Sequence, residues 1–151
     1  MLDDTDKRLL SALQRDAQMT SQELGEALNL SSSQAGRRRQ RLEAEGYIES
    51  YRAHLNHQAI GLNIQAFVQV QMTTHGQPEA LSLSRLLKTR PEVVSVWTLT
   101  GDADYLLRVF CNDLAALNEL IHHFLVPHPA VARVQSQIVM EQVKSDAPLP
   151  L

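Results

Sequence analysis

The sequence predicts an α+β protein in which an N-terminal helix-turn-helix domain precedes a ferredoxin-like βαββαβ domain. Apolar residues recur at helical spacing in the first third of the chain, and capping signals mark where helices begin. The remainder follows the order strand, helix, strand, strand, helix, strand, which a ferredoxin-like sandwich requires. A short repeat supports this order, because Pro-x-Val-x-x-Val follows each of the two later helices, at Pro91 and at Pro129.

The first three expected elements are helices. Asp3 or Asp4 caps the first, which turns Leu9, Leu10 and Leu13 inward. The third helix is expected to run to about residue 45, with a glycine at its C-terminal cap.

A very short turn separates the second helix from the third, which is helix-turn-helix spacing. Thr20 with Glu23 forms the capping box that opens the second helix, and Ser31 with Gln34 opens the third by the same signal. Asn29 ends the second helix, because asparagine tolerates the left-handed conformation of a tight turn.

The segment Tyr47–Leu55 is expected to be extended, as a small wing or a linking strand, with Ile48 and Tyr51 inward. Residues 56–62 are turn-like and mark a domain boundary. The predicted division is therefore 1–50 for the helical domain with its wing, 51–62 for a hinge strand and linker, and 63–151 for the second domain.

The second domain begins with a half-exposed strand, in which apolar residues and glutamines alternate over residues 64–72. After it we expect a break at 74–79, a helix at 80–88, strands at 93–100 and 105–110, a helix at 113–125 and a strand at 131–143. Gln65, Phe67, Gln69 and Gln71 would lie on the sheet face that the helices leave open. An aromatic side chain among glutamines on an open face indicates a partner sheet, hence a homodimer.

The third helix concentrates positive charge in a chain whose formal net charge is −3. At 100° per residue, Arg37, Arg38 and Arg41 share its outward side with Gln34. Arginine can bind guanine or phosphate in a bidentate manner and glutamine can pair with adenine, so this side fits the major groove of DNA. Serines at the N-terminus of the helix would add hydrogen bonds there. The predicted DNA-binding residues are Ser31, Ser32, Ser33, Gln34, Arg37, Arg38 and Arg41.

A charge run on a helix is also typical of a solvated face, and Glu43 and Glu45 stand nearby to pair with the arginines. The capped helix and tight turn that come before it favour the DNA-binding interpretation. Arg39 falls on the inward side, where its stem would follow the core edge and its guanidinium would reach a phosphate or an acid. Gly36 would permit close approach of another helix or of the DNA backbone.

Composition argues against several other classes of protein. A single cysteine, Cys111, excludes a disulfide framework and is expected to be a buried small residue. No apolar run is long enough to span a bilayer, and a cytoplasmic location is expected. Candidate metal ligands are His122, His123 and His128. The side chains of the first two point in different directions from a helix, however, and no HExxH or Cys-x-x-Cys pattern is present. No catalytic residue, metal site or cofactor is predicted, and the protein is not expected to be an enzyme.

Four stretches carry a resemblance that covers essentially the whole chain: LDDTDKRLLSALQRDAQ, SQELGEALNLSSS, RRRQRLEAEGYIESYRAHL and TGDADYLLRV. In this order and at this spacing they resemble the Lrp/AsnC family, the leucine-responsive or feast/famine regulators. The ending LPL is similar to the C-terminus of that family as well.

The resemblance implies a sequence-specific DNA-binding transcriptional regulator, with a winged helix-turn-helix and a C-terminal domain for effector binding and oligomerisation. The implied partners are double-stranded DNA, a small effector that is usually an amino acid, and further copies of the chain, as dimers that assemble to an octamer. Asp102 and Asp104 would face the effector's ammonium group, and the Gly101 backbone would approach it closely. The implied effector-binding residues are Thr100, Gly101, Asp102, Ala103, Asp104 and Tyr105.

From spacing alone, the GDAD stretch is a tight hairpin turn, which is compatible with lining a ligand site. The chain departs from the family pattern at Gln34, Ala35 and Gly36, where the family often has Pro and Cys. It departs again at Arg39, where an aliphatic residue is usual, and at residues 146–147. An architectural DNA-binding protein with weak sequence preference and no effector stays open as the alternative function.

Overall fold

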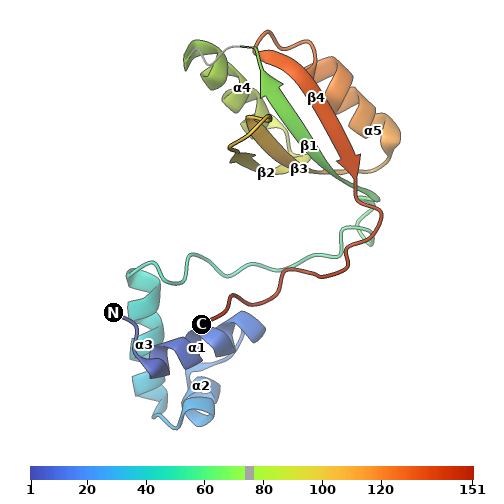
Figure 1. Cartoon of the computed structure of the whole chain (residues 1–151). Helices are drawn as coiled ribbons and strands as arrows, with labels where there is room; N and C mark the ends of the chain where they lie inside the picture. Colours follow the sequence, from blue (N-terminus) through green and yellow to red (C-terminus); the bar gives the residue numbers. More distant parts are fainter. Residues whose placement is uncertain (74–76) are drawn as a thin grey trace. The chain divides into compact units, whose positions relative to one another are not determined.

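The computed structural model describes residues 1–73 and 77–151, which form two compact units (Figure 1). Unit 1 contains residues 1–54 and 143–151, and unit 2 contains residues 55–142. The C-terminal residues belong to unit 1 because the side-chain amide of Gln14 exchanges hydrogen bonds of 2.5 and 3.2 Å with the Leu149 backbone. The predicted division at residues 50 and 62 remains a prediction.

Three helices make up unit 1: α1 (Asp4–Arg15), α2 (Ser21–Leu28) and α3 (Ser32–Ala44). Each begins at a reciprocal capping box, in which the side chain of the N-cap residue and that of the third helical residue each accept a backbone N–H. The boxes at Thr20 and Ser31 confirm the sequence prediction, and so does Asp3 as the cap of α1. Their core is a single cluster that contains Leu9, Leu10, Leu13, Leu24, Leu28, Ala35 and Leu42.

The turn between α2 and α3 is tight because Gly25 lets its own backbone approach that of the turn, and Gly36 lets α3 approach a side chain of α2. Asn29 adopts the predicted left-handed conformation (φ 57°), and the Leu30 N–H donates to the Gly25 carbonyl at 2.8 Å. A Cβ on Gly25 would lie 2.7 Å from the Leu30 carbonyl oxygen, and one on Gly36 would lie 3.1 Å from Ser21 Oγ of α2. The expected close approach of another helix at Gly36 is thus confirmed.

The segment after α3 differs from the prediction. Gly46 (φ 76°) ends the helix in a Schellman motif, in which the Tyr47 N–H reaches the Leu42 carbonyl at 2.9 Å. Residues 47–55 then form no strand, because no described segment pairs with them and a lone strand leaves its backbone groups unpaired. Ile48 packs against the core as predicted, but Tyr51 is 40% exposed, so its inward placement was wrong.

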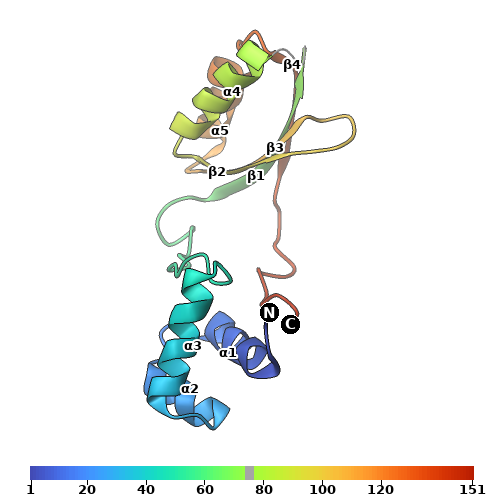
Figure 2. The same ribbon diagram turned by 90° about the vertical axis from the view of Figure 1, so that its left-hand side faces the viewer.

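Unit 2 is the predicted ferredoxin-like sandwich. Its elements are β1 (Ile64–Met72), α4 (Gln77–Thr89), β2 (Val93–Thr98), β3 (Tyr105–Cys111), α5 (Leu114–Glu119), a π-helical turn η1 (Leu120–Leu125) and β4 (Val131–Ile138). The sheet has the order β2-β3-β1-β4 with every pair antiparallel. Figure 2 shows α4 and α5 on one side of the sheet and the other side uncovered.

The covered face holds the core. Ala66, Val68 and Val70 of β1 are fully buried there against Leu83 of α4 and Leu120 at the start of η1. The alternation predicted for β1 is confirmed, and Gln65 shares the face of Phe67 as expected, although it is only 7% exposed. Cys111 is buried, as predicted.

Several predicted boundaries shift. β2 ends at Thr98 rather than residue 100, and β4 ends at Ile138 rather than residue 143. β4 stops because Ile138 already pairs with Ala66, close to the start of its neighbour β1. Asp113 caps α5 as predicted, and the helix expected to reach Leu125 finishes in π-helical geometry. The predicted break at 74–79 lies outside the described residues at 74–76, and α4 already begins at Gln77.

Candidate nucleic-acid interface and effector site

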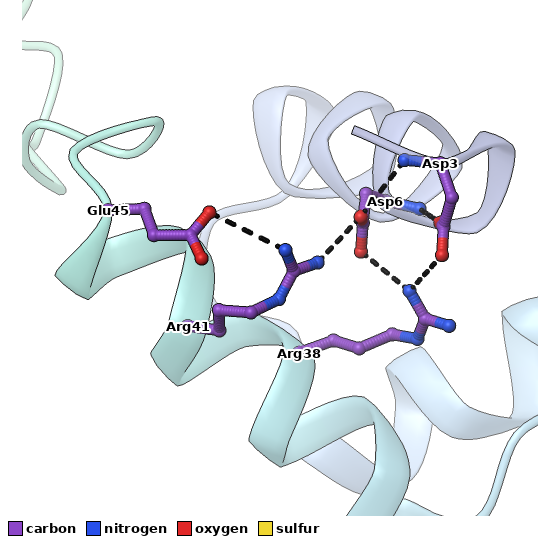
Figure 3. Close-up of polar contacts among 5 residues, drawn as sticks. All are labelled: Asp3, Asp6, Arg38, Arg41 and Glu45. Carbon is purple, nitrogen blue, oxygen red and sulfur yellow. Dashed lines mark hydrogen bonds and ion pairs between the residues drawn. The ribbon is translucent and has the colours of Figure 1, made fainter. Parts of the chain in front are cut away.

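Two of the arginines predicted to face outward on α3 instead contact α1 (Figure 3). Arg38 Nη1 donates to Asp3 Oδ2 and to Asp6 Oδ1, each at 2.7 Å, and Arg41 Nη2 donates to Asp6 Oδ2 at 2.6 Å. The second terminal nitrogen of Arg41 donates to Glu45 at 3.4 Å. We call Asp3, Asp6, Arg38, Arg41 and Glu45 the α1–α3 ion-pair network.

Asp6 is the centre of this network. Its side chain is 1% exposed, and it also accepts the Asp3 backbone N–H at 3.1 Å. Burial alone would raise the pKa of Asp6, but hydrogen bonds from Arg41, from the Asp3 backbone and from Arg38 outweigh it and lower the pKa to about 2. Arg38 likewise lowers the pKa of Asp3. Asp6 is therefore a buried carboxylate that stays ionised between two guanidinium groups.

The sequence analysis missed Asp6, although a signal for it was present. Asp6, Leu10 and Leu13 follow the spacing of four and three residues that defines the buried stripe of α1. An acidic residue on such a stripe needs a charged partner, because an unpaired buried charge is strongly destabilising. Arg38 and Arg41, one helical turn apart on α3, supply it.

Arg39 lies at the core edge, as predicted, and its guanidinium reaches an acid. Its Nε donates to Glu43 at 3.1 Å and to the Tyr51 hydroxyl at 3.0 Å, and Nη1 donates to the Met19 carbonyl at 2.9 Å. The guanidinium also lies 4.7 Å from the centre of the Tyr51 ring. This set of contacts fixes the segment after α3 against the helix without any β pairing.

The outward face of α3 is narrower than the sequence predicted. Arg37 is exposed there, with its Nε donating to the Ser33 carbonyl at 3.4 Å, and Gln40 follows it one turn later on the same side. Gln34 is exposed too, but its side-chain oxygen accepts from the Ser31 backbone and hydroxyl within the capping box. Ser32 and Ser33 are exposed at the first turn. Gln40 was not among the predicted residues, although it is three positions from Arg37.

A cavity of about 490 Å³ opens beside this face. It is lined by Met1, Asp3, Asp6, Leu30, Gln34, Arg37, Arg38 and Arg41. Four predicted DNA-binding residues therefore line one hollow, together with the acidic residues of α1. The surface can offer both hydrogen-bond donors and acceptors to a nucleic acid.

The predicted effector hairpin joins β2 to β3. Gly101 takes a φ of 107°, which favours glycine, and the Leu99 N–H donates to the Asp104 carbonyl at 2.9 Å. The Asp104 carboxylate accepts the Met72 backbone N–H at 2.7 Å, at the irregularity where β1 shifts register. Asp104 thus anchors the hairpin to β1, a role that the sequence analysis did not foresee.

Two hairpin residues line a small hollow on the open face of the sheet. Asp102 and Ala103 contribute to it together with Gln69, Gln71, Arg133 and Gln135, and its volume is about 50 Å³. Thr100 and Gly101 are exposed and Tyr105 is half-buried, and none of the three lines this hollow. The structure therefore brings Asp102 and Ala103 together with a cation and three amides.

His122 and His123 are exposed on η1. Within residues 1–73 and 77–151, no group of three or more His, Cys, Asp or Glu side chains is placed to hold a metal ion. None of the described helices has the length and apolar character needed to cross a bilayer.

Comparison with known proteins identifies both units. Residues 65–149 match the model of the Lrp/AsnC ligand binding domain, and residues 2–49 match that of a winged helix-turn-helix DNA-binding domain. The chain belongs to the Lrp/AsnC family. It is therefore a DNA-binding transcriptional regulator with a ligand-binding domain, as the resemblance implied.

Lrp/AsnC relatives match along nearly their whole length. The DNA-binding transcriptional activator DecR of Escherichia coli is 33% identical over 100% of this chain and 99% of its own. The glutamate uptake regulatory protein of Zymomonas mobilis is 35% identical over 99% of this chain and 91% of its own. A transcriptional regulator of Neisseria meningitidis, solved as a complex with L-Met, superposes with a TM-score of 0.95 at 33% identity and covers 99% of this chain and 97% of its own.

Proposed function

We propose that this Lrp/AsnC protein is a sequence-specific regulator whose DNA binding or assembly responds to an amino-acid effector. The observation that carries the proposal is the hollow beside the hairpin, where Asp102 and Arg133 lie on one surface. A carboxylate suits an ammonium group and a guanidinium suits a carboxylate, so the pair is complementary to a zwitterion. The L-Met complex of the Neisseria relative supports an effector of this class.

Titration of DNA binding tests the proposal directly. Fluorescence anisotropy would compare DNA from upstream of the protein's own gene with a scrambled duplex, and each of the twenty amino acids would be added in turn. Preference for the upstream DNA that changes with one amino acid supports the proposal and names the effector. Equal, salt-sensitive binding to both duplexes with no ligand effect favours the architectural alternative instead.

Asp102→Ala should abolish the amino-acid response, because it removes the carboxylate proposed to hold the ammonium group. The affinity for DNA should stay unchanged, because Asp102 is an exposed residue of unit 2. Glu119→Ala is the matched control, since it removes an exposed carboxylate from α5. A full response in Asp102→Ala would remove this residue from the effector site. Asp104→Ala is a poorer test, because it also takes away the acceptor for the Met72 N–H.

The proposed DNA contacts come from the exposed face of α3. Arg37 is its cation, flanked by Ser33 and Gln40, while Arg38 and Arg41 contact DNA only with the donors that the α1–α3 ion-pair network leaves available. Because a transcriptional regulator must reach the DNA, the proposed function supports the expected cytoplasmic location.

Arg37→Ala should weaken DNA binding on all sequences about equally and lower the salt slope by about one unit, the amount expected for one lost phosphate contact. Anisotropy at several salt concentrations measures both quantities, and sedimentation velocity checks that the oligomer is unchanged. Arg85→Ala, which removes an exposed cation from α4, is the control. If both variants keep the wild-type slope, Arg37 makes no phosphate contact.

We further propose that the open sheet face forms the homodimer. Cross-strand partners share a face, so Trp97, Leu106, Gln69 and Gln135 lie there together with Phe67. Trp97 is 45% exposed, which is unusual for so large an apolar side chain in an isolated unit. The octamer is proposed by analogy with the family.

A further inference from the structure

We infer that Asp6 is a positioning residue for DNA recognition, which holds the Arg38 guanidinium by one nitrogen and presents its opposite edge to a DNA base. The inference goes beyond the proposed contacts of α3 and rests on that helix being the recognition helix. It assigns to Asp6, a buried residue of α1, a function in recognition of the DNA sequence.

The division of donors on Arg38 is the first support. Nη1 serves both carboxylates, Asp3 and Asp6, whereas Nε and Nη2 make no hydrogen bond to any residue in the described ranges 1–73 and 77–151. Figure 3 shows the second terminal nitrogen of Arg38 pointing away from both carboxylates. Two adjacent N–H donors on one edge of a guanidinium are what bidentate recognition of guanine or phosphate uses.

Arg41 provides an internal contrast. Its two terminal nitrogens are both engaged, Nη2 with Asp6 and Nη1 with Glu45. Arg41 therefore braces the far side of the Asp6 carboxylate, and Arg38 is the member of the pair with an open edge.

The position of Asp6 suits it to orient another group. Its backbone belongs to the first turn of α1, its side chain is 1% exposed, and each carboxylate oxygen accepts from a different arginine. A solvated arginine must lose much rotamer freedom when it binds a base, and a guanidinium that is already oriented loses less. Arg38 itself lines the cavity that Gln34 and Arg37 also line.

The carboxylates have a second effect, which makes the inference testable. Asp3 and Asp6 offset the charge of Arg38 and Arg41 and so weaken the attraction of α3 for any phosphate backbone. Removal of the Asp6 charge should therefore strengthen binding to arbitrary DNA while it weakens discrimination between sequences. Damage to folding alone would not move these two quantities in opposite directions.

The test compares Asp6→Asn with Asp4→Asn in the full-length protein. Asp4 is exposed on the same turn of α1, is not part of the α1–α3 ion-pair network, and its replacement changes the net charge equally. The probes are a duplex that the wild-type protein selects from a random pool and a shuffled duplex of the same composition. Anisotropy at low temperature, where circular dichroism verifies folding, gives the ratio of the two affinities.

We expect Asp4→Asn to leave the ratio unchanged and Asp6→Asn to lower it at least about fivefold, the smaller end of what one bidentate base contact contributes. An Asp6→Asn ratio equal to that of Asp4→Asn overturns the inference. If the wild-type protein enriches no duplex, sequence-specific binding itself fails, which is a different result from a selective wild type with an indifferent variant.

Arg38→Lys keeps the inference open to refutation if Asp6→Asn does not fold. Lysine retains the charge and can pair with Asp6, but it lacks the two-donor edge. The ratio should again fall at least about fivefold with an unchanged salt slope. A wild-type ratio in Arg38→Lys would show that the open edge of Arg38 reads nothing, and it would overturn the inference.

Discussion

Asp6→Ala should lower the free energy of unfolding of unit 1 by about 2–3 kcal/mol. The variant deletes an acceptor that two guanidinium groups and one backbone N–H share, and a hydrogen bond to a charged group contributes about 1.5–3 kcal/mol. Arg38 and Arg41 have side chains that are 31% and 37% exposed, so water can solvate them again. The loss should therefore stay below the roughly 3–5 kcal/mol typical of breaking a fully buried pair.

The chain contains its own control for this measurement. Its single tryptophan, Trp97, belongs to β2 in unit 2, whereas the helices α1, α2 and α3 dominate unit 1. Urea unfolding followed at 222 nm should show the loss, while the Trp97 fluorescence midpoint stays where it is in the wild type. Asp4→Ala, on the same turn of α1, should change neither transition.

Acid should remove the difference between the wild type and Asp6→Ala. The pKa of Asp6 is lowered in the folded state to about 2, so its stabilisation is fully present above the ordinary aspartate value near 3.8. It is lost as the pH falls from about 4 towards 2, because the unfolded chain takes up the proton first. A stability difference that stays constant over this range would mean that Asp6 does not act as a buried carboxylate.

The local features of the fold could be predicted because local chemistry determines them. The capping boxes at Thr20 and Ser31 each need only a hydroxyl and an acceptor three residues apart, and both form as expected. The left-handed Asn29 and the alternation of β1 are local in the same sense. Such signals predicted the order of the helices and of the four sheet strands, but not that residues 47–55 form no strand.

Features that depend on a residue distant in the sequence could not be predicted from such local signals. Wheel geometry placed Arg38 and Arg41 outward, since it does not register a carboxylate 32 or 35 residues away. The end of β4 depends on where β1 begins, and the exposure of Tyr51 depends on Arg39 and Glu43. For the candidate site, wheel geometry therefore identified the helix that carries the arginines but not which of those arginines are already paired.

Gly25→Ala should destabilise unit 1 by about 2 kcal/mol, although alanine is the better helix former. Alanine in place of glycine inside a helix gains about 1 kcal/mol. The new Cβ would lie 2.7 Å from the Leu30 carbonyl oxygen and 3.3 Å from the Ser31 carbonyl carbon and the Ser32 nitrogen. These atoms belong to the backbone of the turn, so α2 and α3 must separate, and forced repacking of this kind costs about 1–3 kcal/mol or more.

Gly36→Ala is the matched comparison on α3, where the new Cβ would meet a side chain of α2 rather than the backbone of the turn. Its Cβ would lie 3.1 Å from Ser21 Oγ, which is the end of a side chain and can rotate away. The helix-propensity gain should then dominate, and the variant should be as stable as the wild type or about 1 kcal/mol more stable. Urea unfolding at 222 nm measures both variants. Equal effects at the two glycines would mean that backbone proximity in the turn does not explain Gly25, whereas opposite signs would show that the turn dictates how closely α2 and α3 pack.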